Sequence, residues 1–281
     1  MQYGISTHVY LPQRLTPVLL DTLQSAGAQA IEVFASRHHF DYTDRAAVRE
    51  VADWFKSNDV TATLHMPLFT EDEEANWSRH TQPTLNLINT NKGARIEAMD
   101  EVKRSLEAAE QIPFRYCVLN LGQRDDTWDN RALDDSLTAI EHLKAFASPL
   151  GVQLLLENLT NAVSTPENLL EILRVGHFAN AGICFDVAHA HLASSVAEAF
   201  ELLAPRIKEL HLHDNHAHEG GLGDEHLWPG DGSLDWPALG KQLQTLAPET
   251  IGMFEIAYEP GDADIEENTK RAWTVVTAET A

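Results

Sequence analysis

The chain has 281 residues, of which 43% are hydrophobic and 22% are charged. On length alone it can bury a large core, in one domain or in two. Aspartate and glutamate number 43 against 20 lysines and arginines, which gives a formal charge of −23 with histidine neutral. Because such a charge repels phosphate groups at long range, the composition argues against a non-specific nucleic-acid binder and against a protein of anionic membrane surfaces.

No apolar run approaches the roughly 20 residues that a membrane-spanning helix needs. The segment Met1–Ser6 also lacks the basic and apolar regions of a signal peptide. Cys117 and Cys184 are the only cysteines, so no disulfide framework is predicted. These features together predict a cytoplasmic protein.

Short apolar runs recur along the chain, and a longer segment with helical periodicity follows each one. Because the runs are almost continuously apolar, they suit strands that are buried on both faces of a parallel sheet. The expected strands are Gln2–Ser6, Ala30–Ala35, Val60–His65, Tyr116–Leu121, Gln153–Glu157, Gly182–Asp186, Ile207–His211 and Ile251–Ile256. The expected helices are Pro17–Ala26, Asp44–Ser57, Gly93–Gln111, Asn130–Leu150, Pro166–Val175, Ser195–Leu203, Trp236–Leu246 and Ile265–Thr277.

Eight β-then-α units in about 250 residues predict a (β/α)8 TIM barrel. A doubly wound open sheet is the alternative, but it usually has fewer strands and a glycine-rich first turn. The segment Ser6–Tyr10 has no phosphate-loop pattern. We therefore predict a single TIM-barrel domain over residues 1–281, with a long polar loop insertion at about 67–91. A loop of that length after a barrel strand is more often functional than idle.

Polar side chains stand at the ends of the expected strands, where the catalytic residues of a barrel gather. Carboxylate oxygens and imidazole nitrogens together suit Zn²⁺, Mn²⁺ or Co²⁺. A divalent cation is also the simplest counter-charge for carboxylates that converge on one mouth. The residues at or just after these ends are His65, Asn120, Glu157, Asp186, His189, His211, His213 and Glu255.

Structural roles remain open for several of these residues. Glu157 and Glu255 could form buried salt bridges, and Asp186 could be the N-cap of a following helix. His65 could be a hydrogen-bonded core histidine. The remaining isolated histidines are interpreted as surface or loop residues; they are His8, His38, His39, His80, His142, His177 and His218.

The segment Gly182–His189 resembles the Gly-x-x-x-Asp-x-x-His strand of the xylose isomerase-like TIM barrels. This superfamily contains sugar and sugar-phosphate isomerases and epimerases, and also the endonuclease IV group of AP endonucleases. Further segments resemble the family in the same order: His65–Pro67, Leu154–Asn158, Leu210–Asp214, Gly230–Trp236 and Phe254-Glu255. The resemblance extends over nearly the whole chain, and the order and spacing of the motifs make it specific.

The resemblance implies a metal centre and an acid/base pair. In the isomerases Glu, Asp, His and Glu hold one divalent ion, and these positions fall on Glu157, Asp186, His211 and Glu255. His213 is an alternative to His211, because alternate residues of a strand share a face. His189 would then contact the substrate. The metal would be one Mn²⁺, Zn²⁺ or Co²⁺ ion, with Mg²⁺ as a further candidate.

The nuclease alternative depends on a three-zinc pattern. His65, Asp224, Glu225 and His226 can also be matched to the ligands of endonuclease IV. The remaining ligand of that group, a histidine after the fourth strand, falls on Asn120. Asparagine is a poor zinc ligand, so a complete three-metal cluster is not expected. His65, Asn120, His213, Asp224 and His226 would then serve a second ion or the substrate.

The expected function is therefore that of a metal-dependent isomerase or epimerase of a small sugar, sugar phosphate or related keto-polyol. It would act by proton transfer through a cis-enediolate, with Glu157 and Glu255 as the acid/base pair and His189 orienting a substrate oxygen. An endonuclease IV-like AP endonuclease and a metal-dependent dehydratase are the alternatives. A non-catalytic metal or sugar binder is less consistent with two intact glutamates.

The partner is expected to be a small carbohydrate, with no nucleic acid and no membrane, and a homo-oligomer stays open. Apolar walls of the site could come from Trp77, Phe34, His8 and Trp228. The cations near the motifs, Arg37, Arg124 and Lys208, are scattered and are interpreted as solvated surface. No phosphate subsite is predicted from them.

Overall fold

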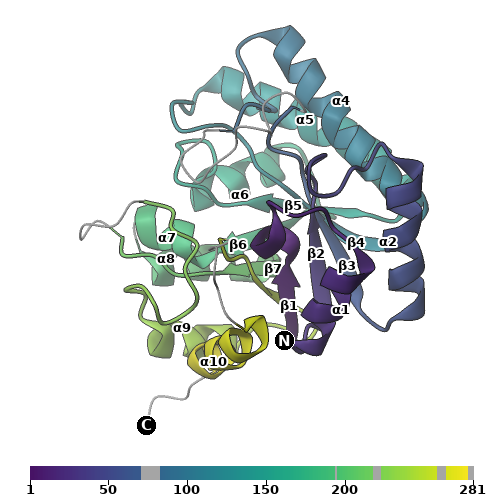
Figure 1. Cartoon of the computed structure of the whole chain (residues 1–281). Helices are drawn as coiled ribbons and strands as arrows, with labels where there is room; N and C mark the ends of the chain where they lie inside the picture. The colour runs from purple at the N-terminus through teal and green to yellow at the C-terminus, as the bar shows by residue number, and fades with distance from the viewer. Residues whose placement is uncertain (71–82, 194, 218–222, 258–263, 278–281) are drawn as a thin grey trace.

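A computed structural model describes residues 1–70, 83–193, 195–217, 223–257 and 264–277. Its eight parallel strands pair in sequence order and close into a barrel, which confirms the predicted fold (Figure 1). The strands are β1 (Gln2–Ser6), β2 (Ala30–Phe34), β3 (Thr61–His65), β4 (Phe114–Leu119), β5 (Gln153–Glu157), β6 (Gly182–Asp186), β7 (Ile207–Leu212) and β8 (Ile251–Phe254).

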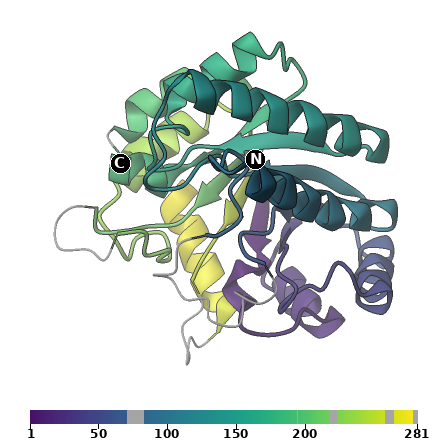
Figure 2. The same ribbon diagram turned by 90° about the horizontal axis from the view of Figure 1, so that it is seen from above.

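Helices surround the sheet, as Figures 1 and 2 show. They are α1 (Pro17–Ser25), α2 (Arg45–Ser57), α4 (Lys92–Glu107), α5 (Asn130–Ala147), α6 (Pro166–Val175), α7 (Val187–Ala193), α8 (Val196–Leu203), α9 (Trp236–Leu243) and α10 (Ile265–Thr277). Short 3-10 helices are η1 (Thr7–Tyr10), η2 (Ala108–Glu110), η3 (Ser148–Leu150) and η4 (Ala204–Arg206). Within the described ranges, none of these helices is long and apolar enough to cross a membrane.

Two elements that directly follow strands were not expected from the sequence. The helix α7 begins directly after Asp186, so that no loop residues separate it from β6. The 3-10 helix η1 follows β1 in the same way, and the Ser6 side chain caps it by accepting a hydrogen bond from His8 N. Both elements lie at the carboxyl ends of strands, and both therefore turn their first residues toward the mouth of the barrel.

The strand period of two separates two apolar layers. Residues such as Leu154, Leu156 and Leu210 face outward and pack beneath the helices in the larger core. Leu155 and Cys184 belong to a smaller cluster that fills the barrel interior. Glu157 follows Leu155 by two residues on β5, and Asp186 follows Cys184 by two residues on β6, so both lie on the same interior face. The interior is thus apolar at depth and changes to charged side chains at its carboxyl end.

Candidate metal centre

Four side chains on the interior face meet at the carboxyl end of the barrel. They are the residues that end or directly follow β5, β6 and β8, together with a histidine from β7: Glu157, Asp186, His211 and Glu255. One ligand atom from each lies within 4.8 Å of the others, and all four residues are buried. This group combines three carboxylates and one imidazole, which suits a divalent transition-metal ion. We call it the carboxylate group.

The two oxygens of Asp186 have different partners, which accounts for both roles considered for this residue. Oδ1 accepts a hydrogen bond from His189 N at 2.7 Å and so caps α7. Oδ2 lies 2.8 Å from His213 Nε2 and 3.9 Å from His211 Nδ1. The N-cap fixes the carboxylate plane, and the second oxygen is thereby directed at the histidines of β7.

Without a metal ion, the positive charge of His211 compensates the negative charges of the glutamates in the carboxylate group. Burial opposes ionisation of Glu157 and Glu255, but the nearby His211 outweighs it and holds the pKa of both carboxyls well below the usual range. Burial likewise opposes the charged form of His211, yet the surrounding acidic groups raise its pKa. Metal ligands must be deprotonated, so an ion bound here would displace the proton that His211 holds.

A second group, the histidine group, lies beside the first and consists of His189, His213, Asp224 and His226. Asp224 Oδ2 is 2.9 Å from His189 Nε2 and 3.1 Å from His226 Nε2. His213 Nδ1 and Asp224 Oδ1 are 3.9 Å apart, and both atoms are buried without a hydrogen-bond partner in the described chain. Two unpartnered polar atoms that face each other across such a gap fit an ion between them.

The β7–α9 loop that carries Asp224 and His226 is anchored by the buried carboxylate of Asp214. This carboxylate accepts hydrogen bonds from Trp236 Nε1 at 2.7 Å and from the backbone N–H groups of residues 215, 230 and 234. Gly232 passes so close that a Cβ there would lie 2.3 Å from Asp214 Oδ1. The Gly230–Trp236 motif thus has a structural role, because it holds the loop in place.

Every histidine in the two groups directs one ring nitrogen to an oxygen acceptor and leaves the other facing its group. His189 Nδ1 lies 3.1 Å from Asn158 O, and His226 Nδ1 lies 2.8 Å from Glu255 O. Because a carbonyl only accepts, Nδ1 must carry the proton and Nε2 is the nitrogen that can bind an ion. His213 and His211 direct Nε2 in this way toward Asp186 and Glu32, so Nδ1 is the nitrogen that faces the group; in His211 it lies 3.3 Å from Glu157 Oε1. Such fixed tautomers are typical of metal-binding histidines.

Two buried carboxylates beneath the carboxylate group were missed in the sequence. Glu32 Oε2 on β2 lies 3.2 Å from His211 Nε2, and both side chains are fully buried. Glu209 on β7 accepts a hydrogen bond from Thr63 Oγ1 at 3.1 Å. Burial and the nearby Glu32 raise the pKa of Glu209 to about 8. A charged residue inside an otherwise apolar strand run was the available signal, since burial requires a partner for it.

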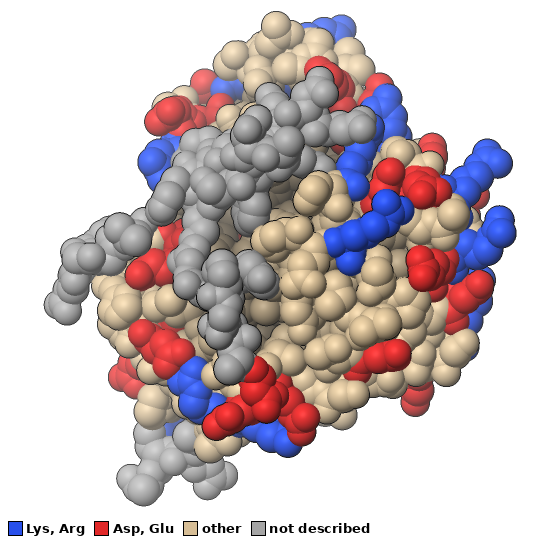
Figure 3. Space-filling model, viewed as in Figure 1, with Lys and Arg blue, Asp and Glu red and all other residues tan. Residues whose placement is uncertain are grey.

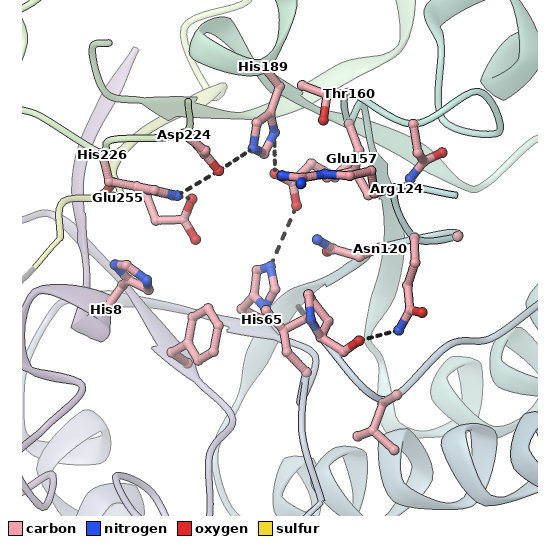
Figure 4. A pocket seen from close by; sticks show the side chains of 18 of the residues that line it. His8, His65, Asn120, Arg124, Glu157, Thr160, His189, Asp224, His226 and Glu255 are labelled. Carbon is pink, nitrogen blue, oxygen red and sulfur yellow. Dashed lines mark hydrogen bonds and ion pairs between the residues drawn. The ribbon is translucent and has the colours of Figure 1, made fainter. Parts of the chain in front are cut away.

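A cavity of about 440 Å³ opens beside both groups (Figure 4). Its wall includes the expected residues His65, Asn120, Glu157, His189, Asp224, His226 and Glu255. His65 Nε2 lies 3.5 Å from Glu157 Oε2, so the strand-three histidine does contact the carboxylate group. Asp186, His211 and His213 lie deeper and do not line the cavity. Thr160 and Asn161 line it without having been predicted.

Several expectations about the wall need correction. His8 is not a surface histidine, because η1 turns it into the cavity, where it stacks on His226 at 5.0 Å. His39 is likewise fully buried. Phe34 lines the cavity as expected, whereas Trp228 packs against Phe254 in the core. Trp77, His80 and His218 lie outside the described residues.

Comparisons with known proteins agree with this architecture. The family model described as the xylose isomerase-like TIM barrel matches residues 20–274. A solved structure titled a D-tagatose 3-epimerase-like protein superposes with a TM-score of 0.75 at 21% identity, over 98% of this chain and 96% of that one. The zinc-bound IolI protein superposes with a TM-score of 0.79 at 18% identity, over 99% and 98%.

A curated relative carries a different name. The probable endonuclease 4 of Natronomonas pharaonis is 27% identical over 175 residues, which cover 56% of this chain and 61% of that protein. The solved structures, at this level of identity, establish the fold only. The family match extends over most of the barrel and includes all eight residues of the two groups. The chain therefore belongs to the xylose isomerase-like TIM barrel family.

Proposed function

We propose that the protein is a divalent-metal-dependent isomerase or epimerase of a small sugar or related keto-polyol. The observation that carries this proposal is the carboxylate group, whose four ligand atoms lie within 4.8 Å of one another at the edge of an open cavity. The cavity volume of about 440 Å³ falls within the roughly 300–1,000 Å³ typical of small-molecule sites. Solved structures titled as sugar epimerases share the fold.

Glu157, Asp186, His211 and Glu255 would hold the ion. Bound there, it would supply a Lewis acid that stabilises negative charge on the oxygens of an enediolate. Glu157 and Glu255 both line the cavity, and each lies 3.3 Å from His211 Nδ1 on a different side of the site. One carboxylate would remove the proton from the carbon beside the carbonyl. The other would deliver a proton to that carbon from the opposite face.

His189 would orient a substrate oxygen. Burial opposes its charged form, but Asp186 and Asp224 raise the pKa of His189 well above the usual range. It lines the cavity next to Glu157, whose Oε1 is 3.3 Å from His189 Nδ1. It is therefore suited to donate a hydrogen bond to an oxygen on which negative charge develops.

The test is exchange of solvent deuterium into carbon-bound positions of a panel of ketoses, measured by NMR in D₂O. We expect exchange that depends on added Mn²⁺, Co²⁺ or Zn²⁺ and stops with a chelator. The same first proton transfer begins a dehydration, and the appearance of a dehydrated product would identify that reaction instead. Metal binding with no exchange on any ketose would contradict the proposal and favour a non-catalytic binder.

An AP endonuclease is the second candidate function, and the histidine group favours it. His189, Asp224 and His226 are brought together within one group, and a curated relative is named a probable endonuclease 4. Two observations oppose it. Asn120 stands where that group of enzymes has a histidine, and the net charge is −23. On the face in Figure 3, lysines and arginines are interspersed with acids and form no continuous basic stripe. Cleavage of an abasic oligonucleotide at low salt would establish the nuclease.

A further inference from the structure

Arg124 is the one lysine or arginine that lines the cavity among the described residues. Its side chain forms no hydrogen bond or ion pair with the chain that the structure describes. By contrast, Arg37, Arg95 and Arg271 each pair with a carboxylate. Both Arg37 and Arg124 were expected to be solvated surface residues; Arg124 is indeed exposed, at the cavity edge, whereas Arg37 is half-buried and pairs with Glu101. An unpaired guanidinium at the edge of a cavity rich in acids is positioned to meet a ligand.

The backbone that carries Arg124 is held in place on both sides. Leu121 O accepts hydrogen bonds from Asn161 Nδ2 at 3.0 Å and from Ser164 Oγ at 2.7 Å. Gly122 has a φ of +74°, a conformation that favours glycine, and turns the chain away from β4. Asp126 Oδ2 then accepts from Gln123 N at 2.8 Å. The base of the Arg124 side chain is therefore fixed before any ligand binds, which lowers the entropic cost of binding.

The cavity has two different sides. Figure 4 shows Asn120 and Thr160 on one side of Glu157, and His8 and His226 on the other; the Arg124 side chain extends from the first side toward Glu157. Asn120 lines the cavity and turns its side-chain nitrogen toward it in Figure 4, so its amide can donate a hydrogen bond to a ligand oxygen. A small ligand that reaches Glu157 can therefore extend along Asn120 toward Arg124.

We propose that Arg124 binds an anionic group, a carboxylate or a phosphate, at the end of the substrate remote from the carbon that reacts. The proposal rests on the proposed function and specifies its substrate class as acidic or phosphorylated sugars. A planar guanidinium binds either anion through two parallel hydrogen bonds. The acidic groups at the other end of the cavity repel such an anion, so the two ends together orient the substrate.

The experiment uses three ketoses that differ only at carbon 6: D-fructose, D-fructuronate and D-fructose 6-phosphate. Their binding to the metal-loaded protein is measured by calorimetry for the wild type and for Arg124→Gln, Arg124→Lys and Arg49→Gln. Arg49 lies exposed on α2 away from the cavity, so Arg49→Gln controls for the loss of one positive charge. Deuterium exchange is followed on the same samples.

We expect the wild type to bind one of the anions about 10- to 100-fold more tightly than D-fructose, as charge-assisted hydrogen bonds allow. Arg124→Gln should abolish this preference and leave D-fructose unaffected. Arg124→Lys should restore part of it, and Arg49→Gln should retain it. The two anionic probes show which anion is bound.

A wild type that binds the three ketoses equally, or binds no anion, overturns the proposal. An anion preference that survives Arg124→Gln also overturns it, because the anion would then bind the metal ion alone. Binding tests Arg124 and exchange tests the proposed function, so the two can fail separately. Arg124-dependent binding without exchange would support the anion site and contradict the isomerase.

Discussion

Replacing Glu32 by glutamine should weaken metal binding at the carboxylate group without removing any ligand. Glu32 Oε2 lies 3.2 Å from His211 Nε2 inside a fully buried pair, and glutamine preserves the shape while it removes the negative charge. A charge-assisted hydrogen bond contributes about 1.5–3 kcal/mol against about 0.5–1.5 kcal/mol for a neutral one. The difference of about 1–1.5 kcal/mol corresponds to a roughly tenfold loss of affinity. Comparable replacements near metal sites cost about 10- to 100-fold.

The assay is a titration of the metal-free protein with Co²⁺ in the presence of a competing chelator, read from the visible absorption of the bound ion. Glu209→Gln is the matched control, because Glu209 is equally buried but hydrogen-bonds to Thr63, whereas Glu32 contacts Nε2 of the ligand His211. Its raised pKa of about 8 leaves it largely protonated at pH 7, and glutamine resembles that neutral form. We expect an affinity loss for Glu32→Gln and almost none for Glu209→Gln.

Two results would refute this reasoning. The first is an unchanged Co²⁺ affinity in Glu32→Gln, which would mean that the charge of Glu32 does not act through His211. The second is an equal loss in both variants, which would indicate a general effect of the buried acids. Circular dichroism of each metal-free variant checks that the barrel remains folded.

Three further predictions concern the same site. Glu157→Gln and Glu255→Gln should each lower deuterium exchange by about 10²–10⁴-fold, while circular dichroism shows that the protein remains folded. Retained exchange in either variant removes that residue from the acid/base pair. Elemental analysis after gel filtration should give one ion per chain, held by the carboxylate group, and a second ion only when metal is added. Asp224→Asn should abolish binding of the second ion alone. Three tightly bound ions would favour the nuclease. Burial opposes the charged form of His226, but Asp224 raises its pKa from 6.5 to about 9. The stability that charged His226 gives the metal-free protein is therefore complete below about pH 6.5 and is lost as the pH rises through 9. Urea unfolding at pH 6 and pH 9 measures this difference, and greater stability at pH 9 would contradict the prediction.

The fold was largely predictable because apolar runs and polar ends alternate sharply. The expected bounds of β5 and β6 match the structure, since both strands begin and end at abrupt changes of polarity. β4 is displaced by two residues, from Tyr116–Leu121 to Phe114–Leu119, because the charged Arg115 masked its beginning. α7 was missed because its cap, Asp186, is also the last residue of β6.

The site was predictable only where a residue stands at the end of a strand. Strand period and strand ends indicated that Glu157, Asp186, His211 and Glu255 would converge, and their ligand atoms do lie together. Their metal-binding role stays a prediction. Residues placed by tertiary contacts escaped this reasoning. Arg124 depends on a hydrogen-bonded turn, and no local pattern in the sequence reports where such a side chain points.

The members of the carboxylate and histidine groups and many of the other cavity-lining residues come from different halves of the chain. All eight members of the carboxylate and histidine groups lie between Glu157 and Glu255, in the half of the barrel built by β5 to β8, whereas Glu32 on β2 belongs to a third candidate group with Glu209 and His211. The half built by β1 to β4 and their loops contributes cavity-lining residues from His8 to Arg124. Mutations in the half built by β1 to β4, Glu32 and His65 apart, can therefore accumulate without changing the carboxylate group. A lineage built on this chain could change its substrate by exchanging that half while it kept the same reaction.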